Sequence, residues 1–171
     1  MNKNDIPVSL IAKRQISKFL KEHGYRSESG YFVMHRGGLT VGVKLFFHAK
    51  GQSDVSELSI ELFGWATGLP EIMGRNNELG WKSPLVAIEL QRLAGMPRGF
   101  TYVMRKDQPT DVEDVVKLIE EGFIEKGFPW LESIQSERDI VRMMRDDHVG
   151  YGSRVKINEW VGKYLEVHPD L

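Results

Sequence analysis

Residues 30–65 constrain the fold more than any other part of the chain, because apolar and polar side chains alternate along them in three runs. The segment reads GYFVMHRGGLTVGVKLFFHAKGQSDVSELSIELFGW. The pair Gly37-Gly38 separates the first two runs and is typical of a two-residue turn, because glycine adopts positive φ without a Cβ clash. That turn would place Arg36 opposite Leu39. We therefore predict a β-hairpin followed by a third antiparallel strand.

The alternation sorts the side chains of this sheet onto two faces, because successive residues of a strand point to opposite sides. The apolar face gathers Phe32, Met34, Leu39, Val41, Val43, Leu45, Phe47, Leu58, Ile60 and Leu62. The opposite face, called the mixed face below, carries aromatic, charged and histidine side chains. Its members are Tyr31, His35, Lys44, Phe46, His48, Glu61, Phe63, Trp65, Glu89 and Gln91. A slip of one residue in the third strand would bury Glu61, so we expect the apolar face to form the core.

The composition excludes several classes of protein and of site. The 171 residues include no cysteine, which excludes disulfides, zinc ribbons, iron–sulfur clusters and thiol nucleophiles. A net charge of -1 supplies no overall attraction to nucleic acid or to an anionic membrane, so either would need a local patch. We see no apolar signal-peptide region and no run near the ~20 apolar residues of a membrane span. We expect a soluble cytoplasmic protein with no cofactor and no membrane partner.

Four further elements are predicted in the first two thirds of the chain. Val8–His23 has apolar residues at helical spacing and is predicted to be a helix. Ala66–Lys82 is a long loop, which Trp81 is expected to hold against the protein. Ser83–Leu93 begins like a helix with a Ser-Pro pair, but its apolar residues alternate, and we predict a fourth strand. Phe100–Arg105 is predicted to be a short fifth strand at an edge.

The last third of the chain is predicted to be helical. Thr110–Lys126 has an apolar stripe of helical period behind a Thr-Asp-Val-Glu capping box, and Gly127 is expected to end it. Phe128–Leu131 should then turn the chain and pack into the core, Ser136 should cap a short helix, and Ile157–Leu165 should lie in a last helix. The chain is therefore predicted to be a single α+β domain. It would contain an antiparallel sheet of four to five strands, with helices packed on its apolar face.

Several turn and core motifs occur in a recognisable order. They are Gly24-Tyr25 after the first helix, the Tyr31–Arg36 strand, Leu93-Ala94-Gly95, Gly127-Phe128-Pro129-Trp130-Leu131 and Ser136-Glu137. In these motifs, residues 10–144 resemble the uncharacterised bacterial family called domain of unknown function 4304. The chain departs from that family by lacking a Gln in the second strand and a Trp pair near Tyr102. The resemblance implies an α+β fold, and it supplies neither an activity nor a catalytic residue.

Five histidines offer metal ligands or catalytic bases, but none lies in a known motif. The chain contains neither HExxH nor GxSxG, and its glycines match neither a P-loop nor a dinucleotide fingerprint. His35 and His48 share the mixed face, where Glu61 would complete a hydrolytic or metal-dependent site if the three side chains converged. Exposed strand histidines explain the pattern more simply, and we predict no metal site.

A basic strip on the first helix offers a nucleic-acid hypothesis. Its four cations are Lys13, Arg14, Lys18 and Lys21. Such a strip could contact phosphates, with an affinity that falls as salt rises. A solvated outer helix face is the simpler explanation, so a nucleic-acid partner is kept only as an alternative.

The mixed face offers the hypothesis that we favour. Aromatic rings beside charges of both signs are typical of a recognition surface. We therefore expect a non-enzymatic bacterial protein that binds a protein or a small molecule, with an immunity-type role against a toxin as one version. The expected binding residues are Tyr31, His35, Lys44, Phe46, His48, Glu61, Phe63 and Trp65. An uncovered face would also permit a homodimer, whereas a cover formed by the last helix or by Ala66–Lys82 would make it a second core.

Overall fold

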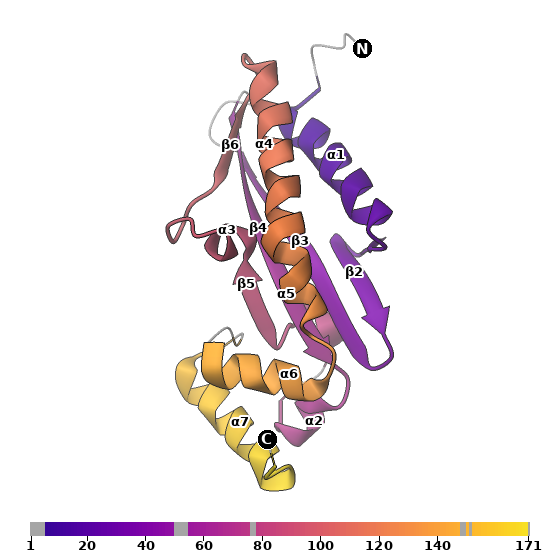
Figure 1. The fold of residues 1–171 in the computed structure, drawn as a ribbon, viewed down its shortest axis with the longest axis vertical. Helices are drawn as coiled ribbons and strands as arrows, with labels where there is room; N and C mark the ends of the chain where they lie inside the picture. The colour runs from indigo at the N-terminus through magenta and orange to yellow at the C-terminus, as the bar shows by residue number, and fades with distance from the viewer. Residues whose placement is uncertain (1–5, 50–54, 76–77, 148–149, 151, 171) are drawn as a thin grey trace.

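One antiparallel sheet forms the centre of the molecule (Figure 1). The computed structural model describes residues 6–49, 55–75, 78–147, 150 and 152–170. The strands are β1 (Arg26–Glu28), β2 (Tyr31–Arg36), β3 (Leu39–Ala49), β4 (Val55–Ala66), β5 (Val86–Glu89) and β6 (Tyr102–Arg105). Their order is β1-β2-β3-β4-β5, and β6 also pairs with β4. The predicted α+β class is confirmed, and the short strand β1 adds to the strands that were predicted.

The hairpin at Gly37-Gly38 has the predicted register. Arg36 pairs with Leu39, so the two glycines form a two-residue loop, and Gly37 has a φ of +61°. β3 then pairs with β4 over its whole length. This pairing puts Val43 opposite Leu62 on the apolar face, as the alternation predicted.

The apolar face is covered by helices. They are α1 (Val8–Glu22), α2 (Leu69–Ile72), α3 (Leu90–Leu93), α4 (Pro109–Gly122), α5 (Phe128–Glu132), α6 (Glu137–Arg142) and α7 (Arg154–Val167). α1 and α4 lie across the sheet, while α6 and α7 lie with α2 at one end of it (Figure 1). Ile16 and Leu20 of α1 and Ile119 of α4 are fully buried in one core with Leu58 and Ile60 of β4. No helix among the described residues combines the length and the apolar character that crossing a membrane requires.

The start of α6 agrees with the predicted Ser136 cap, the start of α7 adds a serine cap that was not predicted, and the start of α4 differs from prediction. Ser136 caps α6 by accepting a hydrogen bond from the Asp139 N–H at 3.3 Å, and Ser153 caps α7 in the same manner. α4 begins at Pro109, and no side chain caps it, so the predicted capping box at Thr110 was wrong. Proline suits this first position because its fixed φ is already helical and its missing N–H would have no helical partner there.

Gly127 does not end the helix that precedes it. The backbone continues through a π-helical segment, Phe123–Gly127, into α5. A Cβ atom on Gly127 would lie 2.9 Å from Phe123 Cδ1 and 3.0 Å from Leu90 Cδ1. The glycine therefore allows α3 to approach closely, which is a packing role that a local sequence pattern does not distinguish from a helix stop.

The outer edge of β4 changes its partner part-way along, and Gln91 fills the gap. β6 pairs with Val55–Leu58, β5 pairs with Glu61–Gly64, and Ile60 lies between the two pairings. Gln91 is fully buried there; its Oε1 accepts the Ile60 N–H at 3.4 Å, and its Nε2 donates to the Phe100 carbonyl at 3.4 Å. The amide thus replaces the missing strand, because a buried backbone N–H needs a partner.

The predicted strand Ser83–Leu93 was therefore right only in part. Its middle forms β5, and the chain then turns into the short helix α3. Gln91 consequently leaves the mixed face, where alternation had placed it, and enters the interior. The reason is that the Ile60 N–H at the edge of β4 needs a polar partner. The alternation of residues within Ser83–Leu93 does not reveal this need, because Ile60 lies in another segment of the chain.

Substitution of Gln91 by leucine should test this role. Gln91→Leu keeps a side chain of similar size but leaves the Ile60 N–H and the Phe100 carbonyl buried without partners. We expect the free energy of unfolding to fall by about 1–3 kcal/mol, measured by urea denaturation. Gln135→Leu, at an exposed position, is the control and should change it little. An equally stable Gln91→Leu protein would contradict the role assigned to this amide.

Candidate functional site

Trp81 divides the mixed face into a closed part and an open part. It belongs to a short 3-10 turn, Gly80–Lys82, in the loop after α2. Its ring stacks on Phe63 with a centroid separation of 6.3 Å and an interplanar angle of 7°, and it meets the edge of Tyr31 at 5.2 Å. The predicted contact of this loop with the protein is therefore present, and it falls on the mixed face.

Two of the expected binding residues lie in the closed part. Phe63 is fully buried and Trp65 is 8% exposed. The Phe63 ring fits over β3 because Gly42 has no side chain: a Cβ atom there would lie 2.5 Å from Phe63 Cζ. Phe63 and Trp65 are therefore buried inside the protein, and a docked partner would not reach them directly.

His35 and Tyr31 lie at the border of the closed part. The Nδ1 atom of His35 is 2.9 Å from Thr40 Oγ1, and its Nε2 atom is 3.3 Å from the carboxylate of Glu28. Both ring nitrogens thus have partners within the sheet. The ring centroid of His35 lies 6.3 Å from that of Trp81, so this histidine packs next to the loop that carries Trp81.

The open part of the mixed face lies beyond Trp81 on strands β3, β4 and β5. It is defined here by Lys44, Phe46, His48, Glu61 and Glu89. His48 is exposed and the other four are half-buried. The described helices lie on the apolar side or at the end of the sheet, which leaves this part without a helical cover (Figure 1).

One row of side chains crosses the open part. Register places Tyr31 beside Lys44, Lys44 beside Glu61, and Glu61 beside Glu89. Lys44 lies over aromatic rings, with its Nζ 4.5 Å from the centroid of Phe46 and 4.9 Å from that of Tyr31. Such cation–π contacts hold the ammonium in place, each contributing about 0.5–1 kcal/mol.

Glu61 is the least favourably placed charge of the row. Burial raises the pKa of its carboxyl group, the Lys44 ammonium lowers that pKa, and the neighbouring Glu89 carboxylate raises it again. Like charges directly opposite each other in a sheet destabilise it. Burial and the neighbouring carboxylate thus disfavour the ionised form of Glu61, while the Lys44 ammonium favours it.

The side chains of the hydrolytic or metal-dependent alternative do not converge. His35 pairs with Thr40 at one end of β3, and His48 lies eight residues farther along the same strand. At ~3.3 Å per residue this separates the two histidines by about 26 Å. Within the described part of the chain, no three His, Cys, Asp or Glu residues are grouped so that they could hold a metal ion.

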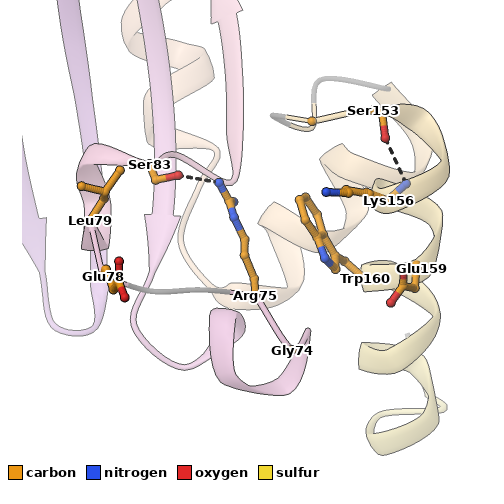
Figure 2. A pocket seen from close by; sticks show the side chains of 10 residues that line it. Gly74, Arg75, Glu78, Leu79, Ser83, Ser153, Lys156, Glu159 and Trp160 are labelled. Atoms are coloured by element: carbon orange, nitrogen blue, oxygen red, sulfur yellow. Dashed lines mark hydrogen bonds between the residues drawn. The ribbon is translucent and has the colours of Figure 1, made fainter.

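Sequence reasoning missed a cleft at the end of the sheet (Figure 2). It has a volume of about 670 Å³ and lies between the segment after α2 and the start of α7. Arg75, Lys156 and Trp160 are the side chains that meet there (Figure 2). They come from segments about eighty residues apart in the chain and from no common motif, so no local pattern could have joined them.

The unfavourable position of Glu61 predicts a pH-dependent stability. Because its pKa is raised in the folded protein, ionisation costs folding free energy as pH rises from about 4.5 through the raised pKa. Glu61→Gln should therefore be more stable than the parent protein at pH 7, by up to about 1 kcal/mol. The difference should shrink below pH 4.5, in chemical denaturation followed across pH.

The exposed Glu125→Gln is the control for this experiment and should leave stability unchanged at every pH. If Glu61→Gln were less stable than the parent at pH 7, the carboxylate would be a structural support and the interpretation of the row would be wrong.

Comparison with other proteins gave no relative. No protein-family model matches the chain, and no match was found among curated proteins or among solved structures. The resemblance to domain of unknown function 4304 therefore stays a prediction.

Proposed function

We propose that this protein is a non-enzymatic binding domain and that its open part of the mixed face docks a protein partner. The observation that carries the proposal is the row Lys44, Glu61 and Glu89 on a sheet surface that none of the described helices covers. A sheet surface suits a protein better than a small molecule, which binds in concave sites.

The charges of the open part indicate the chemistry of the partner. Glu61 and Glu89 are adjacent and half-buried, and Lys44, a cation beside Glu61, lies over Tyr31 and Phe46. A partner that brings an arginine or lysine to the two carboxylates would relieve their repulsion. Phe46 would supply the apolar contact beside this charge pair, as aromatic residues do at many interfaces.

An immunity-type role is one version of this proposal. In that role the open part would cover a basic surface of a bacterial toxin, so that the toxin cannot reach its target. The support is chemical complementarity together with analogy between binding domains, because function belongs to sites rather than to folds.

Charge reversal at Glu89 tests the proposal without weakening the fold. Glu89→Lys would place a cation opposite Glu61, so we expect the melting temperature to stay equal or rise. A bound partner should be weakened by about 2 kcal/mol, or roughly 30-fold, because a cation would face its basic group. The measurement is quantitative pull-down from cells that produce the protein, followed by titration of the purified partner.

Glu166→Lys, on the exposed outer side of α7, is the matched control and should retain the partner. The proposal fails if Glu89→Lys and Glu166→Lys retain the same proteins with the same affinity, or if the parent protein retains none.

A second candidate function uses the outer face of α1. Lys13, Arg14, Lys18 and Lys21 are all exposed on the side opposite the buried Ala12. They lie together along one surface hollow, which also includes the exposed Leu10. This arrangement supports phosphate contacts along a nucleic acid.

The α1 candidate predicts a defined salt dependence. If all four cations contact duplex DNA, a plot of log affinity against log salt should have a slope of about -3.6. Replacement of the four by glutamine should abolish binding, measured by fluorescence anisotropy at low salt. Lys126→Gln, an exposed lysine that does not line this hollow, provides the control. Absence of binding at low salt would remove this candidate.

A further inference from the structure

The cleft beside α7 brings together chemistry that the proposed function does not use. Its volume of about 670 Å³ is in the range of small-molecule sites. Figure 2 shows Arg75 on one wall and Trp160 and Lys156 projecting toward it from α7 on the other. The cleft is concave, whereas the open part of the mixed face is a sheet surface on different strands.

Arg75 is held in position by the wall from which it projects. Its Nη2 atom donates to Ser83 Oγ at 2.7 Å, and its Nη1 atom donates to the Pro84 carbonyl at 3.0 Å. Its guanidinium carbon also lies 4.9 Å from the centroid of the Trp160 ring. Because these contacts fix the side chain, a ligand would bind Arg75 without the entropic cost of ordering it.

Lys156 supplies a second cation from the opposite wall. Its side chain extends from the first turn of α7 toward the wall that carries Arg75 and ends beside Trp160 (Figure 2). Lys156 takes part in none of the ion pairs among the described residues, whereas the nearby Glu159 is paired with Lys163 at 2.7 Å. Glu78 lies beside Leu79 on the far wall (Figure 2). Glu78 and Glu159 also line the cleft, so a bound anion would have to lie on the side of Arg75 and Lys156.

Apolar surface accompanies these cations. Trp160 is half-buried, so part of its indole ring is accessible from the cleft, and Leu79 on the far wall is 67% exposed. Gly152 packs closely on the edge of the indole, where a Cβ atom would lie only 3.2 Å from the ring. Because Arg75 lies over part of the Trp160 ring, a flat ring would lie against the remaining exposed part of the indole while a negative group reached the cations.

We infer that this cleft is a binding site for a small aromatic anion, a molecule in which a flat ring carries a phosphate or carboxylate group. Arg75 and Lys156 hold the anionic group through charge-assisted hydrogen bonds, and Trp160 holds the ring. Adenosine monophosphate and benzoate represent the two sources of this chemistry. The inference is independent of the proposed protein partner.

Isothermal titration calorimetry with four probes tests the inference. Adenosine monophosphate and benzoate carry both the ring and the anion, adenosine carries the ring alone, and inorganic phosphate carries the anion alone. We expect at least one of the two aromatic anions to bind more tightly than both single-feature probes. Lys156→Gln should weaken that binding about tenfold or more, because a hydrogen bond to a charged group is lost.

Two further variants keep the test decisive. Lys126→Gln, far from the cleft, should bind as the parent does, and Trp160→Phe should retain part of the ring contact and of the affinity. Binding of phosphate as tight as that of the aromatic anions would overturn the role of Trp160. The whole inference is overturned if neither aromatic anion binds at millimolar concentration, or if Lys156→Gln and Lys126→Gln bind equally while all variants keep the parental melting temperature.

Discussion

The pairing of β3 with β4 is the constraint on which the rest of this structure depends. It runs along the whole of β3, and it decides for both strands which side chains face the helices and which face away. β4 also carries β5 and β6 on its other edge, and α1 and α6 pack on it. A change of register by one residue would exchange the two faces and remove the core.

Because the helices pack on the apolar face, the mixed face of the sheet is left on the other side. One part of it is closed by Trp81, which stacks on Phe63, and Phe63 in turn lies over the bare backbone of Gly42. The other part keeps two neighbouring carboxylates, Glu61 and Glu89, and burial and Glu89 raise the pKa of Glu61. These carboxylates would suit the partner of opposite charge that we propose.

The two proposed sites differ in shape, and shape decides what each can bind. The open part of the mixed face is a sheet surface, which suits the protein partner that we propose. The cleft between Arg75 and Trp160 is concave and encloses a volume suited to a small molecule. The two lie on different elements of the fold, so occupancy of one leaves the other accessible.

The sequence by itself determined the local features: the hairpin at Gly37-Gly38, the two faces of β2 to β4, the α1 helix and the Ser136 cap. Each depends on neighbouring residues or on a regular period, which alternation and capping chemistry express directly. The tertiary structure decided the roles of Gln91, Gly127 and Trp81, and it decided the position of the cleft. These features arise where segments distant in the chain meet. The role of Gln91 depends on the Ile60 N–H, that of Gly127 on the nearby helix α3, and that of Trp81 on the Phe63 ring on which it stacks.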